Sequence, residues 1–160
     1  MKHLKDLFEA EFKNLYAMEK QIMADIENFP SVEHKKFNKA LNLMAKSNGK
    51  NFEKIKKLNS DMSLNPGSTT DSIIQEILEN IKSIESEKLN SKVKEAGLLA
   101  SFNRLATYRT TAYFNAYRMA RVGKMKSEAK AIKKMMKRSK DEAQRLMKCT
   151  KKSVFKEARA

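Results

Sequence analysis

Apolar residues recur every three to four positions through five segments of the chain, which is the spacing of an α-helix with one buried face. The segments cover residues 4–28, 32–59, 72–86, 93–121 and 126 to beyond 151. Pro30 ends the first segment, and Gly123 can end the fourth. Ser31 is a candidate N-cap for the second segment, and Asp71 or Thr70 is one for the third.

The longest stretch without this periodicity, SDMSLNPGSTTD at residues 60–71, contains an Asn-Pro-Gly turn and is predicted to be a loop. Four long helices and a short one suit an antiparallel four-helix bundle, with the short helix crossing over between the second and third long helices. Only four Gly and two Pro are present, as in an all-α fold. We expect one domain over residues 1–160, frayed from about residue 155. A coiled coil is the weaker alternative, since no heptad pattern persists.

Charged and amide side chains interrupt the apolar faces of three predicted helices. On a helical wheel, Glu11 and Glu19 share the apolar arc of residues 4–28, and Arg109 lies at the middle of the arc of residues 93–121. Asn48 and Asn51 fall on the apolar arc of the second helix. A buried charge is costly unless it is paired.

These positions suggest a polar layer inside the bundle. We predict that Glu19, together with Glu11, pairs with Arg109, and that Asn48 and Asn51 complete the hydrogen bonding. The alternative is that Arg109 extends to the edge of the bundle and the glutamates lie at its rim.

The net charge of +15 is concentrated near the C-terminal end: residues 118–160 hold 16 Lys and Arg against 4 Asp and Glu. On the last helix the cations occupy the arc opposite the apolar one, where Asp141 and, at its edge, Glu142 are the acids. The basic residues of this arc are Lys126, Lys130, Lys133, Lys134, Lys137, Arg138, Arg145, Lys148, Lys151 and Lys152.

A basic face of this kind predicts binding to nucleic acid or another polyanion through phosphates, without sequence preference. A solvated lysine-rich surface is an equally good reading. A membrane-surface helix is less favoured, because the bundle needs the apolar face for its core. No stretch reaches the length of a membrane span, and the lone Cys149 fits a reducing compartment, so we expect a cytoplasmic protein.

The sequence LKDLFEAEFKNLYAMEKQI resembles the opening helix of the YciE/YciF-like ferritin-like family, L-x-D-L-F-x-x-E-L-x-D-L-Y-x-A-E-K-Q-L. A weaker likeness covers KVKEAGLLASFNRLATYRTTAYFNAYRMA in the third long helix. The resemblance implies a ferritin-like bundle, an association with stress, a homodimer by analogy, and a di-metal carboxylate centre.

The ligands that the resemblance implies are mostly missing here. Only Glu19 is kept; Ala106, Thr107, Tyr108 and Arg109 stand where the family has Glu-His-Tyr-Glu. The corresponding positions of the second and fourth long helices fall near Ser47, Asn48, Asn51, Ser139 and Ala143.

We therefore expect a non-catalytic, stress-associated ferritin-like protein without a cofactor or a functional di-metal centre. The alternatives are the nucleic-acid binder described above and a residual di-iron or manganese carboxylate protein. No nucleophilic triad, phosphate loop or zinc spacing is present that would indicate another class of enzyme.

Overall fold

The computed structural model describes the backbone of residues 3–159 and the side chains of residues 3–151 and 153–159. Its elements are the helices α1 (Leu4–Asp25), α2 (Lys35–Asp61), α3 (Ser72–Ser86), α4 (Ser91–Val122), α5 (Lys126–Lys152) and α6 (Val154–Glu157), with a 3-10 turn, η1 (Ile26–Asn28). The predicted all-α fold is confirmed.

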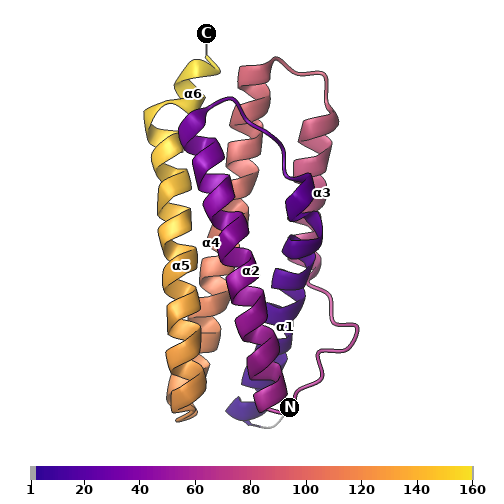
Figure 1. Ribbon diagram of the computed structural model, residues 1–160, viewed down its shortest axis with the longest axis vertical. Coiled ribbons are helices and arrows are strands. Elements are labelled where there is room, and N and C mark those ends of the chain that lie inside the picture. Colours follow the sequence, from indigo (N-terminus) through magenta and orange to yellow (C-terminus); the bar gives the residue numbers. More distant parts are fainter. Residues whose placement is uncertain (1–2, 160) are drawn as a thin grey trace.

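Four long helices form an antiparallel bundle, and α3 carries the chain from one end of it to the other (Figure 1). In the bundle, α1 packs against α2 and α4, and α5 packs against the same two helices. The short α3 lies outside this square, against α1 and α4. Each of the four long helices therefore turns one face toward a shared interior.

The interior is filled mainly by aromatic and aliphatic side chains. Phe8, Phe12, Phe37 and Phe102 are fully buried, and α5 contributes Ile132 among other apolar residues. Burying these faces supplies most of the favourable free energy of folding. In the described part of the chain, no helix combines the length and apolar character that crossing a membrane requires.

Several helix boundaries differ from those predicted by one to three residues, and the start of α2 has a clear structural cause. The N-cap of α2 is His34 rather than Ser31: its Nδ1 accepts a hydrogen bond from the amide of Phe37. The helix starts late because the carboxylate of Glu95 on α4 binds the backbone amides of Glu33 and His34, which holds them outside the helix.

Near the C-terminal end, residues Val154–Glu157 form the short helix α6, and Val154 is buried in the core. The predicted N-cap at Asp71 is confirmed by a 3.1 Å hydrogen bond from the amide of Ile74.

Candidate functional site

Arg109 of α4 lies in the centre of the bundle and is fully buried. Its guanidinium contacts both carboxylate oxygens of Glu19 on α1: Nη2 donates to Oε1 at 2.9 Å and to Oε2 at 3.1 Å, and Nε donates to Oε1 at 3.2 Å. On the other side, Nη1 donates to Oε2 of Glu142 on α5 at 2.7 Å. One cation is therefore held between two carboxylates, with the planar geometry that suits a guanidinium.

Two further side chains donate hydrogen bonds to Glu19. The hydroxyl of Tyr113, one turn along α4 from Arg109, donates to Oε1 at 2.5 Å. The amide nitrogen of Asn48 on α2 donates to Oε2 and, at 3.1 Å, to the backbone oxygen of Glu19. We call Glu19, Asn48, Arg109, Tyr113 and Glu142 the ionic cluster; each of the four long helices contributes to it.

The environment sets the protonation states of the cluster. Burial alone would lower the pKa of Arg109, but the carboxylates of Glu19 and Glu142 outweigh it and raise that pKa. Burial and the neighbouring Glu19 carboxylate raise the pKa of Tyr113, so its hydroxyl stays a neutral donor. Burial also raises the pKa of Glu142, although Arg109 acts in the opposite direction. The cluster is thus built around a permanently charged guanidinium.

Of the predicted polar layer, the structure brings Glu19, Asn48 and Arg109 together and places Glu11 outside. Glu11 is only half-buried. The pKa of Tyr108 is raised mainly by burial and by Asp71, and the charge of Glu11 makes a smaller contribution in the same direction. Eight residues separate Glu11 from Glu19, which is about 80° around the helix and about 12 Å along it. That offset is too large for both carboxylates to reach one guanidinium.

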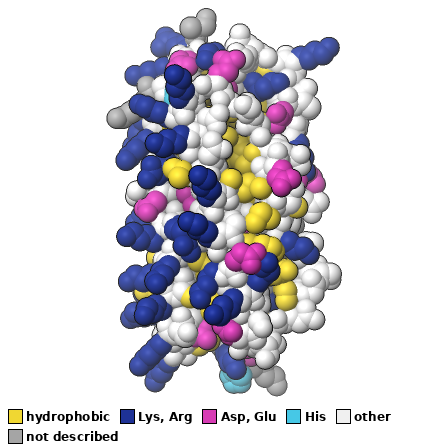
Figure 2. All heavy atoms as spheres, viewed as in Figure 1, with side chains coloured by type: hydrophobic (Ala, Val, Ile, Leu, Met, Phe, Trp, Pro, Cys, Tyr) yellow, Lys and Arg dark blue, Asp and Glu magenta, His cyan; other side chains and the backbone are white. Residues whose placement is uncertain are grey.

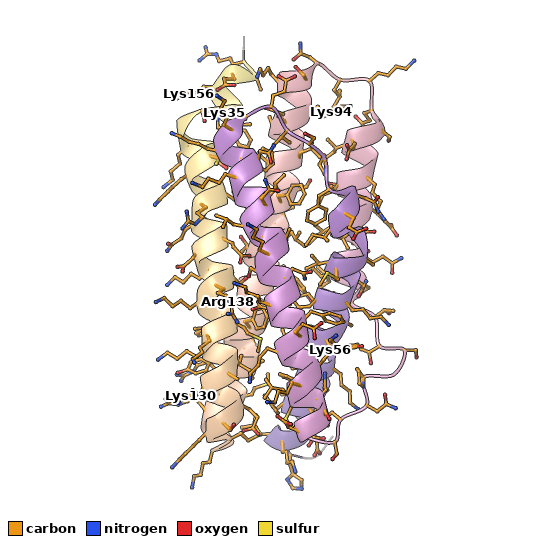
Figure 3. The ribbon with its side chains drawn as sticks, in the orientation of Figure 1. Lys35, Lys56, Lys94, Lys130, Arg138 and Lys156 are labelled. Carbon is orange, nitrogen blue, oxygen red and sulfur yellow. The ribbon has the colours of Figure 1, made fainter. Side chains whose placement is uncertain are left out.

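Asn51 is buried one turn along α2 from the cluster, and its side-chain oxygen accepts a 3.0 Å hydrogen bond from Nε of Arg138. Its amide also acts on Tyr113, whose pKa it tends to lower. Arg138, predicted on the solvated basic arc, is therefore half-buried against α2, and Figure 3 shows it on the side of α5 that faces that helix.

Two members of the cluster, Tyr113 and Glu142, were not part of the predicted polar layer. Glu142 was instead placed at the edge of the basic arc. The signal was nevertheless present: Glu142 follows Ser139 by three positions and precedes Leu146 by four, and both of these are fully buried. Positions three and four apart share one face of a helix. Placing Glu142 on the buried face with Ser139 and Leu146 would have predicted it as the second partner of Arg109.

The cluster does not fit the di-metal centre that the family resemblance implies. Among the described residues, no three His, Cys, Asp or Glu side chains come together as a metal-binding group. The two carboxylates closest to such a group, Glu19 and Glu142, already share a guanidinium that would repel a metal cation. Neither iron nor manganese is matched by this set of donors.

Apart from Arg138 and Lys152, the predicted basic residues of α5 occupy its solvent side. Lys126, Lys130, Lys133, Lys134, Lys137, Arg145, Lys148 and Lys151 are exposed. The side chain of Lys152 lies outside the described residues. In Figure 2, Lys and Arg side chains cover the part of the molecule formed by α5 and continue onto α2, and Figure 3 shows Lys130 pointing outward from α5.

Comparisons with known proteins agree with this architecture. The crystal structure of the E. coli stress protein YciF superposes with a TM-score of 0.84 at 18% sequence identity, covering 92% of this chain and 94% of that one. YcfI from Rhodopseudomonas palustris, described as a candidate structural protein, gives a TM-score of 0.83 at 14% identity, covering 91% and 94%. No curated protein sequence matches significantly. The family described as "Domain of unknown function (DUF892)" matches residues 3–159, so this chain belongs to that YciF-like family of helical bundles.

Proposed function

We propose that this chain is a non-catalytic, stress-associated member of its family, in which a buried ion-pair cluster takes the structural place of a metal centre. One observation carries the proposal: the fully buried guanidinium of Arg109 binds Glu19 of α1 and Glu142 of α5 at the centre of the bundle. Buried carboxylates need a cation to neutralise them, and here the cation is the side chain of Arg109 and not a bound ion.

The chemistry of the cluster supports a structural role. Its one permanent cation cannot change oxidation state or release a proton near neutral pH, and Tyr113 is held as a neutral donor. All five members are buried, and four of them, Glu19, Asn48, Arg109 and Tyr113, are fully so, whereas a substrate site is usually an open pocket. The association with stress rests on the likeness to YciF, which is named as a stress protein.

Metal analysis tests the proposal directly. The chain is purified without chelators, incubated anaerobically with Fe²⁺ or Mn²⁺, freed of excess metal, and measured by mass spectrometry of its metal content. We expect only traces of metal. Stoichiometric iron or manganese in the wild-type protein would overturn the proposal.

The variant Arg109→Glu serves as the matched comparison. It replaces the guanidinium with a third carboxylate beside Glu19 and Glu142, which is the type of donor set that divalent cations prefer. We expect this variant to gain metal binding, seen as bound metal and as a rise in thermal midpoint when Mn²⁺ is added. That gain would show that the wild-type result comes from Arg109 and not from the assay.

A further inference from the structure

Nearly all the excess positive charge of the chain lies on two helices that pack side by side. Together α2 and α5 contain 19 Lys and Arg against 5 Asp and Glu, whereas the rest of the chain contains 15 against 14. The two helices are distant in sequence, yet they are neighbours in the bundle (Figure 1). Tertiary packing therefore merges the cations of α2 with those of α5 into one surface, which we call the α2/α5 face.

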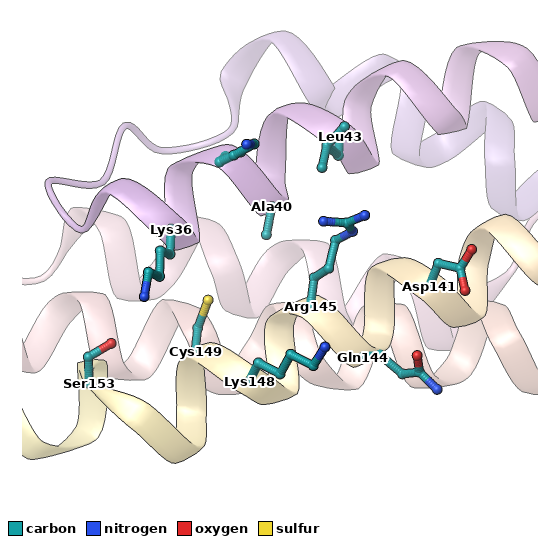
Figure 4. Close-up of a pocket in the computed structure, with 10 residues that line it drawn as sticks. Lys36, Ala40, Leu43, Asp141, Gln144, Arg145, Lys148, Cys149 and Ser153 are labelled. Carbon is teal, nitrogen blue, oxygen red and sulfur yellow. The ribbon is translucent and has the colours of Figure 1, made fainter.

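A groove of about 530 Å³ runs between the two helices at one end of this face (Figure 4). Its rim carries four cations, Lys36, Lys39, Arg145 and Lys148, and one acid, Asp141. Among the described residues, none of these four cations forms an ion pair. Arg145 reaches from α5 toward Ala40 and Leu43 of α2, as Figure 4 shows. The positive charge of the groove is thus left available to an external anion.

We propose that the α2/α5 face binds the phosphate backbone of duplex nucleic acid without reading its sequence. Each helix is 27 residues long, so the face extends for about 40 Å, the length of roughly 12 base pairs. The cations are spread along this length rather than converging on one point, which suits a rod of regularly spaced phosphates better than a small anion.

A membrane surface fits the α2/α5 face less well. Among the described residues of α2 and α5, Met147 is the only large apolar side chain that is strongly exposed. The apolar face of α5, including Ile132 and Leu146, is buried in the bundle core. An interfacial helix needs such a face to enter the lipid.

Single-stranded nucleic acid fits less well for a different reason. Proteins that bind single strands stack the bases on exposed aromatic rings. The aromatic residues of α2 are Phe37, which is buried, and Phe52, which packs against Tyr16, while α5 has none. Of these three partners, duplex nucleic acid therefore fits the α2/α5 face best, because its binding needs only charge complementarity to the phosphate backbone.

Fluorescence anisotropy with a labelled duplex of about 20 base pairs tests the proposal over a series of salt concentrations. The test variant is Lys39→Gln/Arg145→Gln/Lys148→Gln, which removes three cations from the groove. The matched control, Lys20→Gln/Lys88→Gln/Arg118→Gln, removes the same charge from exposed residues outside α2 and α5. Circular dichroism and thermal midpoints establish that both variants fold.

We expect micromolar or tighter binding at about 50 mM salt, equal for duplexes of different sequence, with affinity falling steeply as salt rises. The groove variant is expected to lose at least about tenfold in affinity, and its log–log salt slope to shrink by about 2 to 3. The control variant is expected to change about twofold or less, as a distant exposed charge does. Wild-type binding no tighter than millimolar would overturn the proposal, as would equal losses in the two variants or preferential binding to anionic lipid vesicles or to single strands.

Discussion

Arg109 and Glu142, which are 33 residues apart on α4 and α5, are joined by a 2.7 Å hydrogen bond inside the bundle. Arg109 is also the partner of Glu19, so one guanidinium serves two carboxylates. If all three were ionised, the cluster would carry an excess negative charge. Burial raises the pKa of Glu142, although Arg109 acts in the opposite direction, so this carboxyl keeps its proton to a higher pH than an ordinary glutamate does.

Replacing Arg109 with Ala is expected to lower the free energy of unfolding by about 3–5 kcal/mol, because Glu19 and Glu142 would remain buried without a cation. Urea unfolding measures the change. Arg118→Ala, on an exposed position of the same helix, is the control and is expected to stay within about 0.5 kcal/mol of wild type. If Arg109→Ala also stayed within about 0.5 kcal/mol of wild type, the cluster would not be buried.

Neutralising the whole ion-pair group is expected to recover much of that loss. In the variant Glu19→Gln/Arg109→Met/Glu142→Gln no charge is left inside, and a buried ion group can often be replaced by uncharged residues at little cost. Gln at position 19 can still accept a hydrogen bond from Tyr113. The triple variant should unfold at a clearly higher urea concentration than Arg109→Ala. Equal or lower stability would contradict the view that unpaired charge causes the loss.

The pH dependence of stability should reveal the raised pKa of Glu142. Between its ordinary pKa of 4.5 and the raised one, the folded protein holds a proton that the unfolded chain has released. Stability contributed by this group therefore falls as pH rises through that window. Compared with wild type, Glu142→Gln is expected to become relatively more stable as pH increases above 4.5, in urea unfolding from acidic to neutral pH. A difference that is constant with pH would rule out this titration.

Tyr113→Phe removes one donor from the buried Oε1 of Glu19. A hydrogen bond to a charged group contributes about 1.5–3 kcal/mol, and we expect a loss of that size in the free energy of unfolding. Tyr117→Phe, on the same helix but half-buried, is the matched control and is expected to have little effect. If the two variants lost the same stability, the hydroxyl of Tyr113 would have no special role.

Asp71 fixes the loop before α3 through both oxygens of its carboxylate. Its Oδ1 caps the helix at Ile74, and its Oδ2 accepts a 2.7 Å hydrogen bond from the hydroxyl of Tyr108. Asp71→Ala is expected to cost about 1–2 kcal/mol or more from the lost cap. Asp71→Asn keeps an acceptor oxygen for the cap and is expected to cost less. Thermal unfolding distinguishes them, and the reverse order would exclude capping as the cause.

The bundle was largely predictable because helix periodicity and end signals are local. Five helical segments, the loop after α2 and the caps at Asp71 and Gly123 follow from residues a few positions apart. The start of α2 was not predictable in this way, because it depends on Glu95, which is 62 residues away from Glu33 in the chain. A local pattern contains no information about such a contact.

The sequence by itself determined that Glu19 and Arg109 lie on apolar faces, because a helical wheel needs only the spacing of one segment. Tertiary structure alone decided which charged groups meet: it turned Glu142 inward, left Glu11 outside, and joined the lysines of α2 to those of α5. The physical reason is that the rotation and axial register of each helix are set by packing against its neighbours, and a shift of one residue moves a side chain by about 100°.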